Sequence, residues 1–276
     1  MAGEPEQQTL DDIRRRLTAS VGAADSEWIL SHVLETSRTE LYRHPRRPLS
    51  EVERSQAQAL AARRAAGEPL QYVLGRWGFR RLDLLVDARA LIPRPETEIV
   101  VERCLALLAG VEAPRVLDVG TGSGAIALAI ADEHPGAAVT GIDVSEDALA
   151  LAHENAGHTG LSIELARHDV ADGLPGTGWD LVVSNPPYVA EHERGSLEPA
   201  VGEWEPDVAL VARGQTEALV GAAATALASG GALVVETSER GAAPLAQLLA
   251  RHSFVDIRTT RDLAGRDRVV EGRRAP

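Results

Sequence analysis

The residues with the most distinctive chemistry are Asn185-Pro186-Pro187-Tyr188. They follow residues 180–184 (Asp-Leu-Val-Val-Ser), a short apolar run that predicts a buried strand. Two prolines cannot continue a strand, and proline keeps the residue before it extended, so a stiff loop is expected at the carboxyl end of this strand. The Asn185 amide, the Pro186 carbonyl and the Tyr188 ring could together bind a planar group that carries NH2 hydrogens. An ordinary Asn-Pro-Pro turn is the alternative interpretation.

A glycine-rich segment, Gly120-Thr121-Gly122-Ser123-Gly124, follows a predicted strand at residues 115–119. Glycines let a backbone turn sharply and approach a ligand closely. A predicted helix at 125–133 begins at once, so its N-terminal amides would face that ligand. Read with Ala125, the segment also fits the Gly-x-Gly-x-x-Gly/Ala pattern of dinucleotide sites. A nicotinamide-dependent dehydrogenase is therefore an alternative at this point.

Acidic residues follow the next two predicted strands. Asp143 ends the strand at 138–143, about 20 residues past the glycine segment, a position that suits a ribose diol. Asp169 and Val170 follow the strand at 162–166, where Asp169 could accept a hydrogen bond from an adenine amino group. A ribose and an adenine occur in both NAD and S-adenosylmethionine. His168 has no second histidine at ligand spacing, so no metal site is expected.

The Asn185–Tyr188 loop favours methyl transfer over hydride transfer. A dehydrogenase usually needs an acid or base such as histidine at its site, and no such residue stands out here. A methyl donor needs mainly a nucleophile held in line with the methyl carbon, and positioning alone can accelerate such a reaction by many orders of magnitude. The loop itself does not distinguish an amide nitrogen from an adenine nitrogen.

The elements that would position these residues alternate from residue 115 onward. Strands are expected at 115–119, 138–143, 162–166, 180–184, 232–237, 254–259 and 268–271, and helices at 125–133, 146–157, 216–228 and 242–251. This alternation predicts a parallel sheet with helices on both faces. Before it, residues 9–67 predict a small helical domain, and residues 70–92 predict a β-hairpin with strands at 71–74 and 82–86.

Composition narrows the functional classes. The 276-residue chain has 44% hydrophobic residues and a net charge of −13, and all its strongly basic residues are arginine. An acidic protein lacks the basic footprint typical of nucleic-acid binding. The sequence shows no apolar run of the ~20 residues that a membrane helix needs, and its first residues lack a signal-peptide pattern. The single cysteine, Cys104, excludes an internal disulfide. These features predict a cytoplasmic protein that binds neither membranes nor nucleic acid stably.

The motifs resemble those of class I S-adenosylmethionine-dependent methyltransferases that modify planar nitrogens. Four further stretches are similar to HemK-type peptide chain release factor glutamine methyltransferases: residues 67–75 (Gly-Glu-Pro-Leu-Gln-Tyr-Val-Leu-Gly), 92–98 (Ile-Pro-Arg-Pro-Glu-Thr-Glu), 205–210 (Glu-Pro-Asp-Val-Ala-Leu) and 262–268 (Asp-Leu-Ala-Gly-Arg-Asp-Arg). The motifs run in the family's order over nearly the whole chain. DNA adenine methyltransferases share the Asn-Pro-Pro-Tyr loop alone, whereas residues 93–98 and the helical N-terminal domain are more specific.

The resemblance implies an α/β fold with a Rossmann-like class I methyltransferase sheet that is mostly parallel with the last strand antiparallel. It implies a small N-terminal helical bundle at residues 1–69 for substrate recognition, a β-hairpin linker at 70–92, and a catalytic domain at 93–276. A monomer without a bound metal is expected.

The resemblance also implies roles for the site residues. The segment Gly120, Thr121, Gly122, Ser123, Gly124 would wrap the methionine and ribose of S-adenosylmethionine, Asp143 would hold the ribose hydroxyls, and Asp169 with Val170 would border the adenine. Val170 stands where relatives often have an aromatic residue.

The substrate implied by the resemblance is the glutamine in the Gly-Gly-Gln loop of a release factor. Asn185, which also borders the donor, and the Pro186 carbonyl would accept hydrogen bonds from its amide, while Pro187 stiffens the loop and Tyr188 packs on the amide plane. A ribosomal-protein glutamine, a nucleic-acid adenine, and a non-catalytic binding module remain the alternatives.

Overall fold

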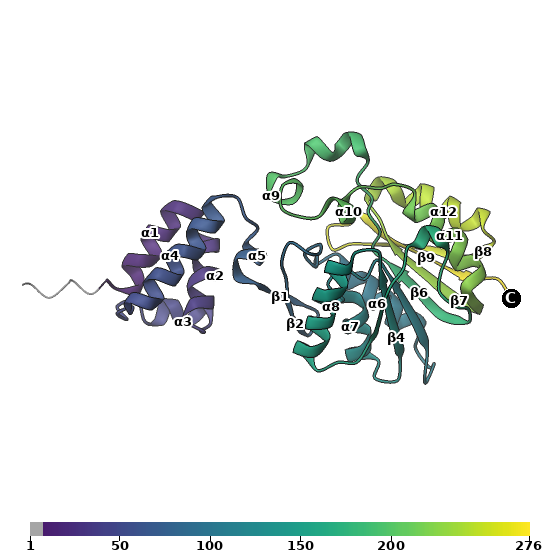
Figure 1. The fold of residues 1–276 in the computed structure, drawn as a ribbon, viewed down its shortest axis with the longest axis horizontal. Helices are drawn as coiled ribbons and strands as arrows, with labels where there is room; N and C mark the ends of the chain where they lie inside the picture. Colours follow the sequence, from purple (N-terminus) through teal and green to yellow (C-terminus); the bar gives the residue numbers. More distant parts are fainter. Residues whose placement is uncertain (1–7) are drawn as a thin grey trace, which may run out of the picture. The chain divides into compact units, whose positions relative to one another are not determined.

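The computed structural model describes residues 8–276, so the first seven residues of the predicted N-terminal domain lie outside the described residues. Residues 8–75, together with Pro199–Trp204, form one compact unit. Arg76–Glu198 and Glu205–Pro276 form the second (Figure 1). The division therefore falls after Gly75, and the hairpin belongs to the second unit.

The first unit is helical. It contains α1 (Leu10–Val21), α2 (Ala23–Val33), α3 (Arg38–Arg43), α4 (Glu51–Ala65), α5 (Leu70–Leu74) and α9 (Pro199–Gly202). Reciprocal capping boxes begin α1, between Thr9 and Asp12, and α4, between Ser50 and Glu53. Each box satisfies backbone N–H groups that the first turn of a helix leaves without a partner.

The strand predicted at residues 71–74 is wrong, because these residues form α5. A four-residue apolar run fits a buried strand or a buried helical turn equally well. The structure selects the helix because Gly75 closes it in a left-handed conformation, with φ of 70° and its N–H bonded to the Gln71 carbonyl. The hairpin is present but begins later, with β1 (Arg76–Phe79) paired antiparallel to β2 (Leu82–Leu85). The short helix α3, capped by Ser37, was not predicted.

The second unit is built on a sheet that, within the described residues, has seven strands in the order β5-β4-β3-β6-β7-β9-β8. The strands are β3 (Arg115–Val119), β4 (Ala138–Asp143), β5 (Glu164–Arg167), β6 (Trp179–Ser184), β7 (Leu227–Glu236), β8 (Phe254–Arg261) and β9 (Asp267–Arg274). β3, β4, β5, β6 and β7 pair in parallel, whereas β9 is antiparallel to both β7 and β8. The predicted mostly parallel sheet with an antiparallel last strand is confirmed.

The helices of the second unit are α6 (Thr97–Leu107), α7 (Ala125–Glu133), α8 (Glu146–Thr159), α10 (Asp207–Leu210), α11 (Gln215–Ala226) and α12 (Ala242–Arg251), with short 3-10 helices at η1 (Val170–Asp172), η2 (Glu191–Ser196) and η3 (Glu239–Gly241). α7 and α12 have the predicted bounds. α6 begins at Thr97, two residues after Pro95, and the N–H of Thr97 closes a turn onto the Arg94 carbonyl.

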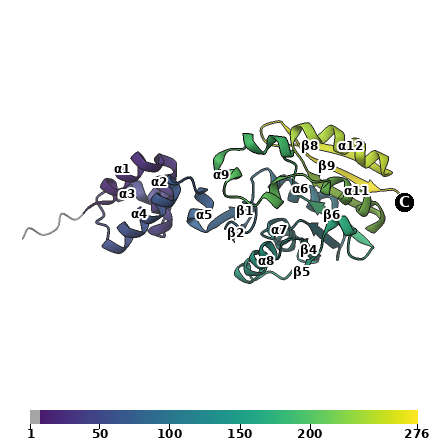
Figure 2. The same ribbon diagram turned by 45° about the horizontal axis from the view of Figure 1, so that its top comes forward.

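The two faces of the sheet are covered by different helices (Figures 1 and 2). Apolar residues of α6 and α7 pack on one face, and those of α11 and α12 pack on the other. This is the layering expected of a parallel sheet, whose strands are buried on both faces. It leaves the carboxyl ends of β3, β4 and β6 free to form a site.

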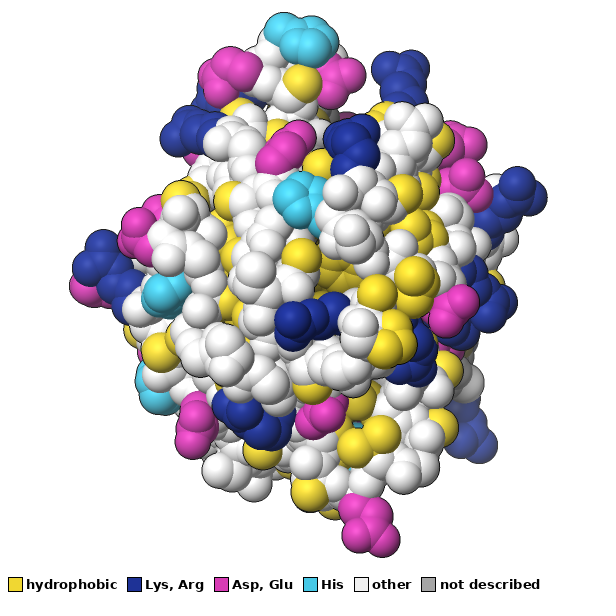
Figure 3. Space-filling model, turned by 90° about the vertical axis from the view of Figure 1, so that its right-hand side faces the viewer, with side chains coloured by type: hydrophobic (Ala, Val, Ile, Leu, Met, Phe, Trp, Pro, Cys, Tyr) yellow, Lys and Arg dark blue, Asp and Glu magenta, His cyan; other side chains and the backbone are white. Residues whose placement is uncertain are grey.

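Charged side chains of both signs share the surface. On the face in Figure 3, Arg side chains and Asp or Glu side chains are interspersed. Several arginines pair closely with carboxylates. The Arg80 guanidinium, for example, donates from Nε and Nη2 to Glu133 at 2.6 and 2.7 Å. Such pairs neutralise much of the positive charge locally.

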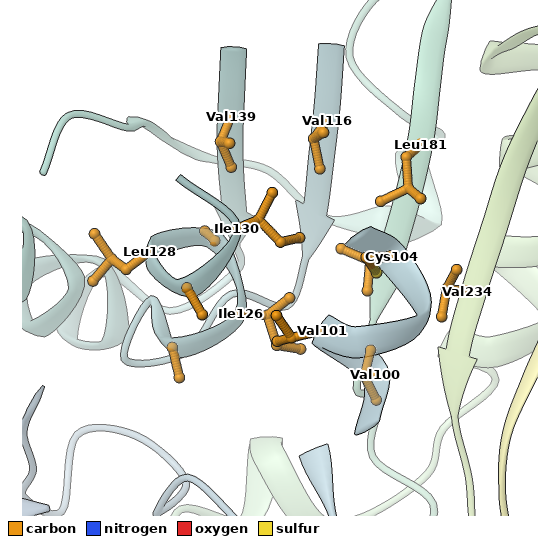
Figure 4. Close-up of a cluster of buried hydrophobic side chains, with 14 of the residues drawn as sticks. Val100, Val101, Cys104, Val116, Ile126, Leu128, Ile130, Val139, Leu181 and Val234 are labelled. Atoms are coloured by element: carbon orange, nitrogen blue, oxygen red, sulfur yellow. The ribbon is translucent and has the colours of Figure 1, made fainter. Parts of the chain in front are cut away.

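The core beneath the site is closely packed. Figure 4 shows Val101 and Cys104 of α6 and Ile130 of α7 directed toward Val116 and Leu181 of the sheet. Cys104 is fully buried, and this burial raises the pKa of its thiol well above the ordinary value. Cys104 therefore belongs to the hydrophobic core.

No helix among residues 8–276 combines the length and the apolar character needed to cross a membrane.

Candidate active site

A cavity of about 410 Å³ opens at the carboxyl ends of β3, β4 and β6. Its lining includes residues 89–94, 119–123, 143–145, 168–171, 184–187 and 213–215. The predicted residues Gly120 to Ser123, Asp143, Asp169, Val170 and Asn185 to Pro187 thus meet around one space. Gly124 and Tyr188 are outside the lining.

The glycine segment turns sharply as it leaves β3. Gly120 and Gly122 have φ of 71° and 56°, in the left-handed region that favours glycine. The N–H groups of Gly120 and Thr121 both donate to the Ile142 carbonyl of β4, at 2.8 and 2.9 Å. A Cβ on Gly141 would lie 2.8 Å from Thr121 Oγ1, so the close crossing over β4 requires a glycine there as well. Gly141 is a site-shaping residue that sequence reasoning missed.

Gly124 shapes the packing beneath the site. It has φ of 81°, and a Cβ on it would lie 3.2 Å from the Leu128 side chain and 3.3 Å from that of Ala152. Gly124 therefore lets α7 begin close against α8. Its position agrees with a structural contribution to the loop.

Asp143 joins the glycine segment to the end of β4. Its Oδ2 accepts from the Gly122 N–H at 2.9 Å, and its Oδ1 accepts from the Ser145 N–H at 2.9 Å. Burial raises the pKa of this carboxyl, and the backbone donors oppose that shift. The carboxylate is thus held at the cavity wall with further lone pairs available to a diol.

Asp169 and Val170 form the wall beyond β5. Asp169 caps η1, its Oδ1 accepting from the Ala171 N–H at 2.9 Å, and it remains exposed. Val170 packs against the apolar cluster that contains α11. This part of the cavity offers one carboxylate and one small apolar surface.

Asp118 lies under the glycine segment and is fully buried. Its Oδ2 accepts from Thr121 Oγ1 at 2.7 Å and from the Ala127 N–H at 3.2 Å, whereas Oδ1 has no hydrogen-bond partner among the described residues. Burial raises the pKa of this carboxyl to about 7.

The raised pKa predicts how stability depends on pH. Between the unfolded value of 3.8 and about 7, the folded protein keeps the Asp118 proton and the unfolded chain has lost it. The free energy of unfolding should therefore fall as pH rises through this window, by at most about 1.4 kcal/mol per pH unit. Asp118→Asn should flatten this slope in urea unfolding at a series of pH values. Equal slopes for the two proteins would contradict the prediction.

The loop Asn185–Tyr188, called the acceptor loop from here on, is anchored at both ends. Ser184 Oγ donates to the Val119 carbonyl at 2.7 Å, which ties β6 to β3 just before the loop. After it, the Val189 N–H donates to the Leu210 carbonyl at 3.0 Å. Asn185 Nδ2 lies 3.3 Å from Thr97 Oγ1. Tyr188 is 39% exposed, and partial burial together with the charge of Glu236 raises the pKa of its hydroxyl.

Sequence reasoning missed four side chains that support the cavity, and they form two pairs. Thr97 Oγ1 donates to Glu236 Oε2 at 2.7 Å, and both residues are buried. Arg94 pairs with the buried Glu205, whose other oxygen accepts from the Ile92 N–H at 3.2 Å. Thr97 and Arg94 lie within the distinctive stretch at 92–98, and Glu236 stands at a strand's carboxyl end. These sequence positions were the signals from which the missed side chains could have been found.

Asn155 of α8 is a further missed residue, and it is fully buried. Its Nδ2 donates to the Ser123 and Leu85 carbonyls at 2.9 and 3.1 Å, and its Oδ1 accepts from the Leu85 N–H at 2.7 Å. One carboxamide thus connects the glycine segment, the hairpin strand β2 and α8.

Asn155→Ala should lower the free energy of unfolding by about 2–4 kcal/mol, because buried backbone groups lose their partners. Urea denaturation measures the change. His153→Ala, at an exposed position of the same helix, is the control and should change it by less than about 0.5 kcal/mol. Similar values for the two variants would contradict the role of Asn155.

No group of three or more His, Cys, Asp or Glu side chains placed to hold a metal ion occurs among residues 8–276. The cavity presents the carboxylates of Asp143 and Asp169, backbone N–H groups, and the carboxamides of Asn185 and Gln215. These groups suit an organic ligand that carries hydroxyl and amino groups.

Two family models match the sequence of this chain. Residues 8–75 match the family model described as PrmC N-terminal domain, and residues 97–200 match the one described as Methyltransferase small domain. In fold, the chain is similar to a methyltransferase from Pyrococcus furiosus, with a TM-score of 0.53 and 18% identity over 71% of this chain and 90% of that one.

Two curated relatives illustrate the sequence similarity. The chain is 40% identical to the release factor glutamine methyltransferase of Geobacter sulfurreducens, covering 90% of this chain and 88% of that protein. It is 41% identical to the release factor glutamine methyltransferase of Deinococcus radiodurans, covering 91% of each. The resemblance found in the motifs is confirmed. The chain belongs to the family of release factor glutamine methyltransferases.

Proposed function

We propose that this protein transfers the methyl group of S-adenosylmethionine to the side-chain amide nitrogen of the glutamine in the Gly-Gly-Gln motif of peptide chain release factors. The observation that carries the proposal is the meeting of Asp143, the glycine segment and Asn185 around one cavity. Family membership supports the choice of a glutamine amide over the adenine that the loop alone left open.

The cavity fits the donor in its charges and its backbone. The Asp143 carboxylate would accept from the two ribose hydroxyls, and Gly120 to Gly124 would leave room for the ribose and the methionine moiety. Asp169 would accept from the adenine amino group, with Val170 against the ring. The donor supplies an electrophilic methyl group on a sulfonium.

The acceptor loop would activate the substrate nitrogen. An amide nitrogen is a weak nucleophile because its lone pair is delocalised into the carbonyl. The Asn185 and Pro186 carbonyls would accept its two hydrogens, hold its plane, and return electron density to nitrogen. A new N–C bond forms as the C–S bond of the donor breaks, and the amide then releases one proton. Preorganised dipoles in a cavity shielded from water stabilise such developing charge strongly.

Pro187 and Tyr188 would complete the loop. Pro187 is part of the lining and keeps the backbone stiff. The Tyr188 ring, at the edge and partly exposed, is available to pack on the amide plane of an incoming glutamine. We propose that its remaining exposure is covered by the substrate.

The test is methylation of purified release factor, with S-adenosylmethionine as donor, followed by peptide mass spectrometry. A single added methyl on the glutamine of the Gly-Gly-Gln motif is expected, and a release factor with that glutamine changed to alanine is the control. A methyl on a ribosomal protein or on nucleic acid, with none on this glutamine, would overturn the proposal.

The helical unit is proposed to recognise the body of the release factor. Its surface presents Trp28 at 38% and Tyr42 at 55% exposure, with the guanidinium groups of Arg38 and Arg14 stacked over their rings at 5.3 and 4.6 Å. Tryptophan, tyrosine and arginine are the residues enriched at energetic centres of protein interfaces. A short peptide carrying the Gly-Gly-Gln motif should therefore show a much higher KM than the whole release factor. Equal KM values for the peptide and the whole release factor would contradict a recognition role for the helical unit.

The remaining partner assignments follow from the same proposal. The net charge of −13 opposes stable nucleic-acid binding. Because release factors act in translation, we propose a cytoplasmic location, and because the cavity is lined by one chain, we propose that the monomer is active.

A further inference from the structure

A chain of hydrogen bonds runs behind the acceptor loop. Asn185 Nδ2 lies 3.3 Å from Thr97 Oγ1, and Thr97 Oγ1 lies 2.7 Å from Glu236 Oε2. The three side chains come from the loop after β6, the first residue of α6 and the last residue of β7. Thr97 and Glu236 are 4% and 1% exposed, so little water competes for these bonds.

The chemistry of the three groups decides which one donates and which one accepts in each of these hydrogen bonds. An ionised carboxylate can only accept, so the single hydroxyl hydrogen of Thr97 goes to Glu236. The Thr97 oxygen then has only lone pairs to offer Asn185, and it must meet the NH2 end of that carboxamide. The Asn185 carbonyl oxygen is thereby turned away from Thr97 and is left available in a residue that lines the cavity.

Protonation of Glu236 would allow the donors and acceptors in these hydrogen bonds to be reversed. A neutral carboxyl can donate to Thr97, whose hydroxyl could then donate to the Asn185 carbonyl oxygen and turn the carboxamide around. The NH2 end of Asn185 would then face the substrate, where an acceptor is needed.

We infer that Thr97 and Glu236 are positioning residues that hold the Asn185 carboxamide with its carbonyl oxygen toward the substrate amide. The inference rests on the proposed function, because it assigns a reason for the orientation that glutamine methylation requires. Both would act through Asn185, because Glu236 lies outside the cavity lining and the Thr97 hydroxyl hydrogen is donated to Glu236.

The charged surroundings of Glu236 make the orientation of the Asn185 carboxamide sensitive to pH. Burial and the nearby Glu96 carboxylate favour the neutral form of Glu236, whereas Arg268 of β9 and Arg94 favour the ionised form, and the balance raises its pKa to about 7. The Tyr188 hydroxyl, from the acceptor loop, is a further titratable neighbour, and the charge of Glu236 helps to raise its pKa. Arg268 is itself fixed by donating to the Thr237 carbonyl and to Asp262 Oδ2, each at 3.2 Å.

The first test compares Thr97→Val, which removes the hydroxyl at nearly constant volume, with Thr97→Ser, which keeps it. Thr97→Val should lower kcat by about 10- to 100-fold, the scale of a small misplacement of a reacting group, with the Kd for S-adenosylmethionine within about threefold of the parent protein. Thr97→Ser should restore kcat to within about threefold. Thr159→Val removes a hydroxyl that donates to the Asn155 carbonyl in α8, and should leave kcat unchanged.

The second test is the pH profile of kcat at saturating donor. The parent protein should gain activity as pH rises through about 7, where Glu236 ionises. In Glu236→Gln this acid limb should vanish, because glutamine does not titrate. Melting temperatures of all variants establish that each is folded at the assay temperature.

The outcomes separate the two proposals. A parent protein that does not methylate the release factor glutamine defeats the proposed function. A parent protein that does so, with Thr97→Val equally active, or with an unchanged acid limb in Glu236→Gln, defeats the positioning role alone.

Discussion

Asn185→Ala should lower kcat for release factor methylation by about a thousandfold, while S-adenosylmethionine still binds. The variant loses the side-chain acceptor that holds one hydrogen of the substrate amide, and removing one such preorganised group typically costs a factor of 100 to 1,000 in kcat. Donor binding should survive because Asp143 and the glycine segment remain in place. Steady-state kinetics gives kcat, and isothermal titration calorimetry gives the donor Kd.

The control for this variant is Gln247→Ala, which removes a carboxamide from an exposed position of α12. It should leave both kcat and Kd unchanged. A donor Kd that rises as much as kcat falls in Asn185→Ala would mean that Asn185 holds the donor and not the acceptor.

Asp143→Ala should weaken S-adenosylmethionine binding by about 100-fold or more. Hydrogen bonds to a charged group contribute about 1.5–3 kcal/mol each, and two bonds to the ribose would be lost together, at about 1.4 kcal/mol per tenfold change in affinity. Calorimetry with donor alone tests this without any release factor. At saturating S-adenosylmethionine, Asp143→Ala should methylate the release factor with a higher kcat than Asn185→Ala does.

Asp143 also holds the Gly122 and Ser145 N–H groups, so a second variant is needed. Asp143→Asn keeps the shape of the side chain and one carbonyl acceptor, and should bind the donor with intermediate affinity. Glu146→Ala removes a nearby surface carboxylate that pairs with Arg167 and should leave the affinity unchanged. If Glu146→Ala and Asp143→Ala weakened binding equally, net charge and not the ribose contact would explain the loss.

Much of the catalytic unit could be predicted from the sequence because its elements are strongly patterned. The bounds of β3, β4, α7 and α12 match the prediction, since each is a continuous apolar or periodic run bounded by glycine, proline or charged residues. The cavity-lining residues after β3, β4 and β6 could be found because parallel strands deliver their carboxyl ends to one edge of the sheet.

What could not be predicted depends on contacts between distant residues or on very short segments. Thr97 and Glu236 are separated by 139 positions, and neither has a motif that announces a partner. In the sequence, Asn155 looks like an ordinary helical residue, because its partners in β2 and the glycine segment are distant along the chain. The five-residue helix α5 was mistaken for a strand because its length allows no periodicity to develop.

The place of β9 has a consequence for synthesis of the chain. This strand, Asp267–Arg274, follows β7 and β8 in the chain, yet it lies between them and pairs with both. Until it is available, the edges of β7 and β8 that it covers are unpaired, a condition that favours association with other chains. The sheet therefore cannot be completed until residues 267–274 have been translated and β9 inserts between two strands made before it.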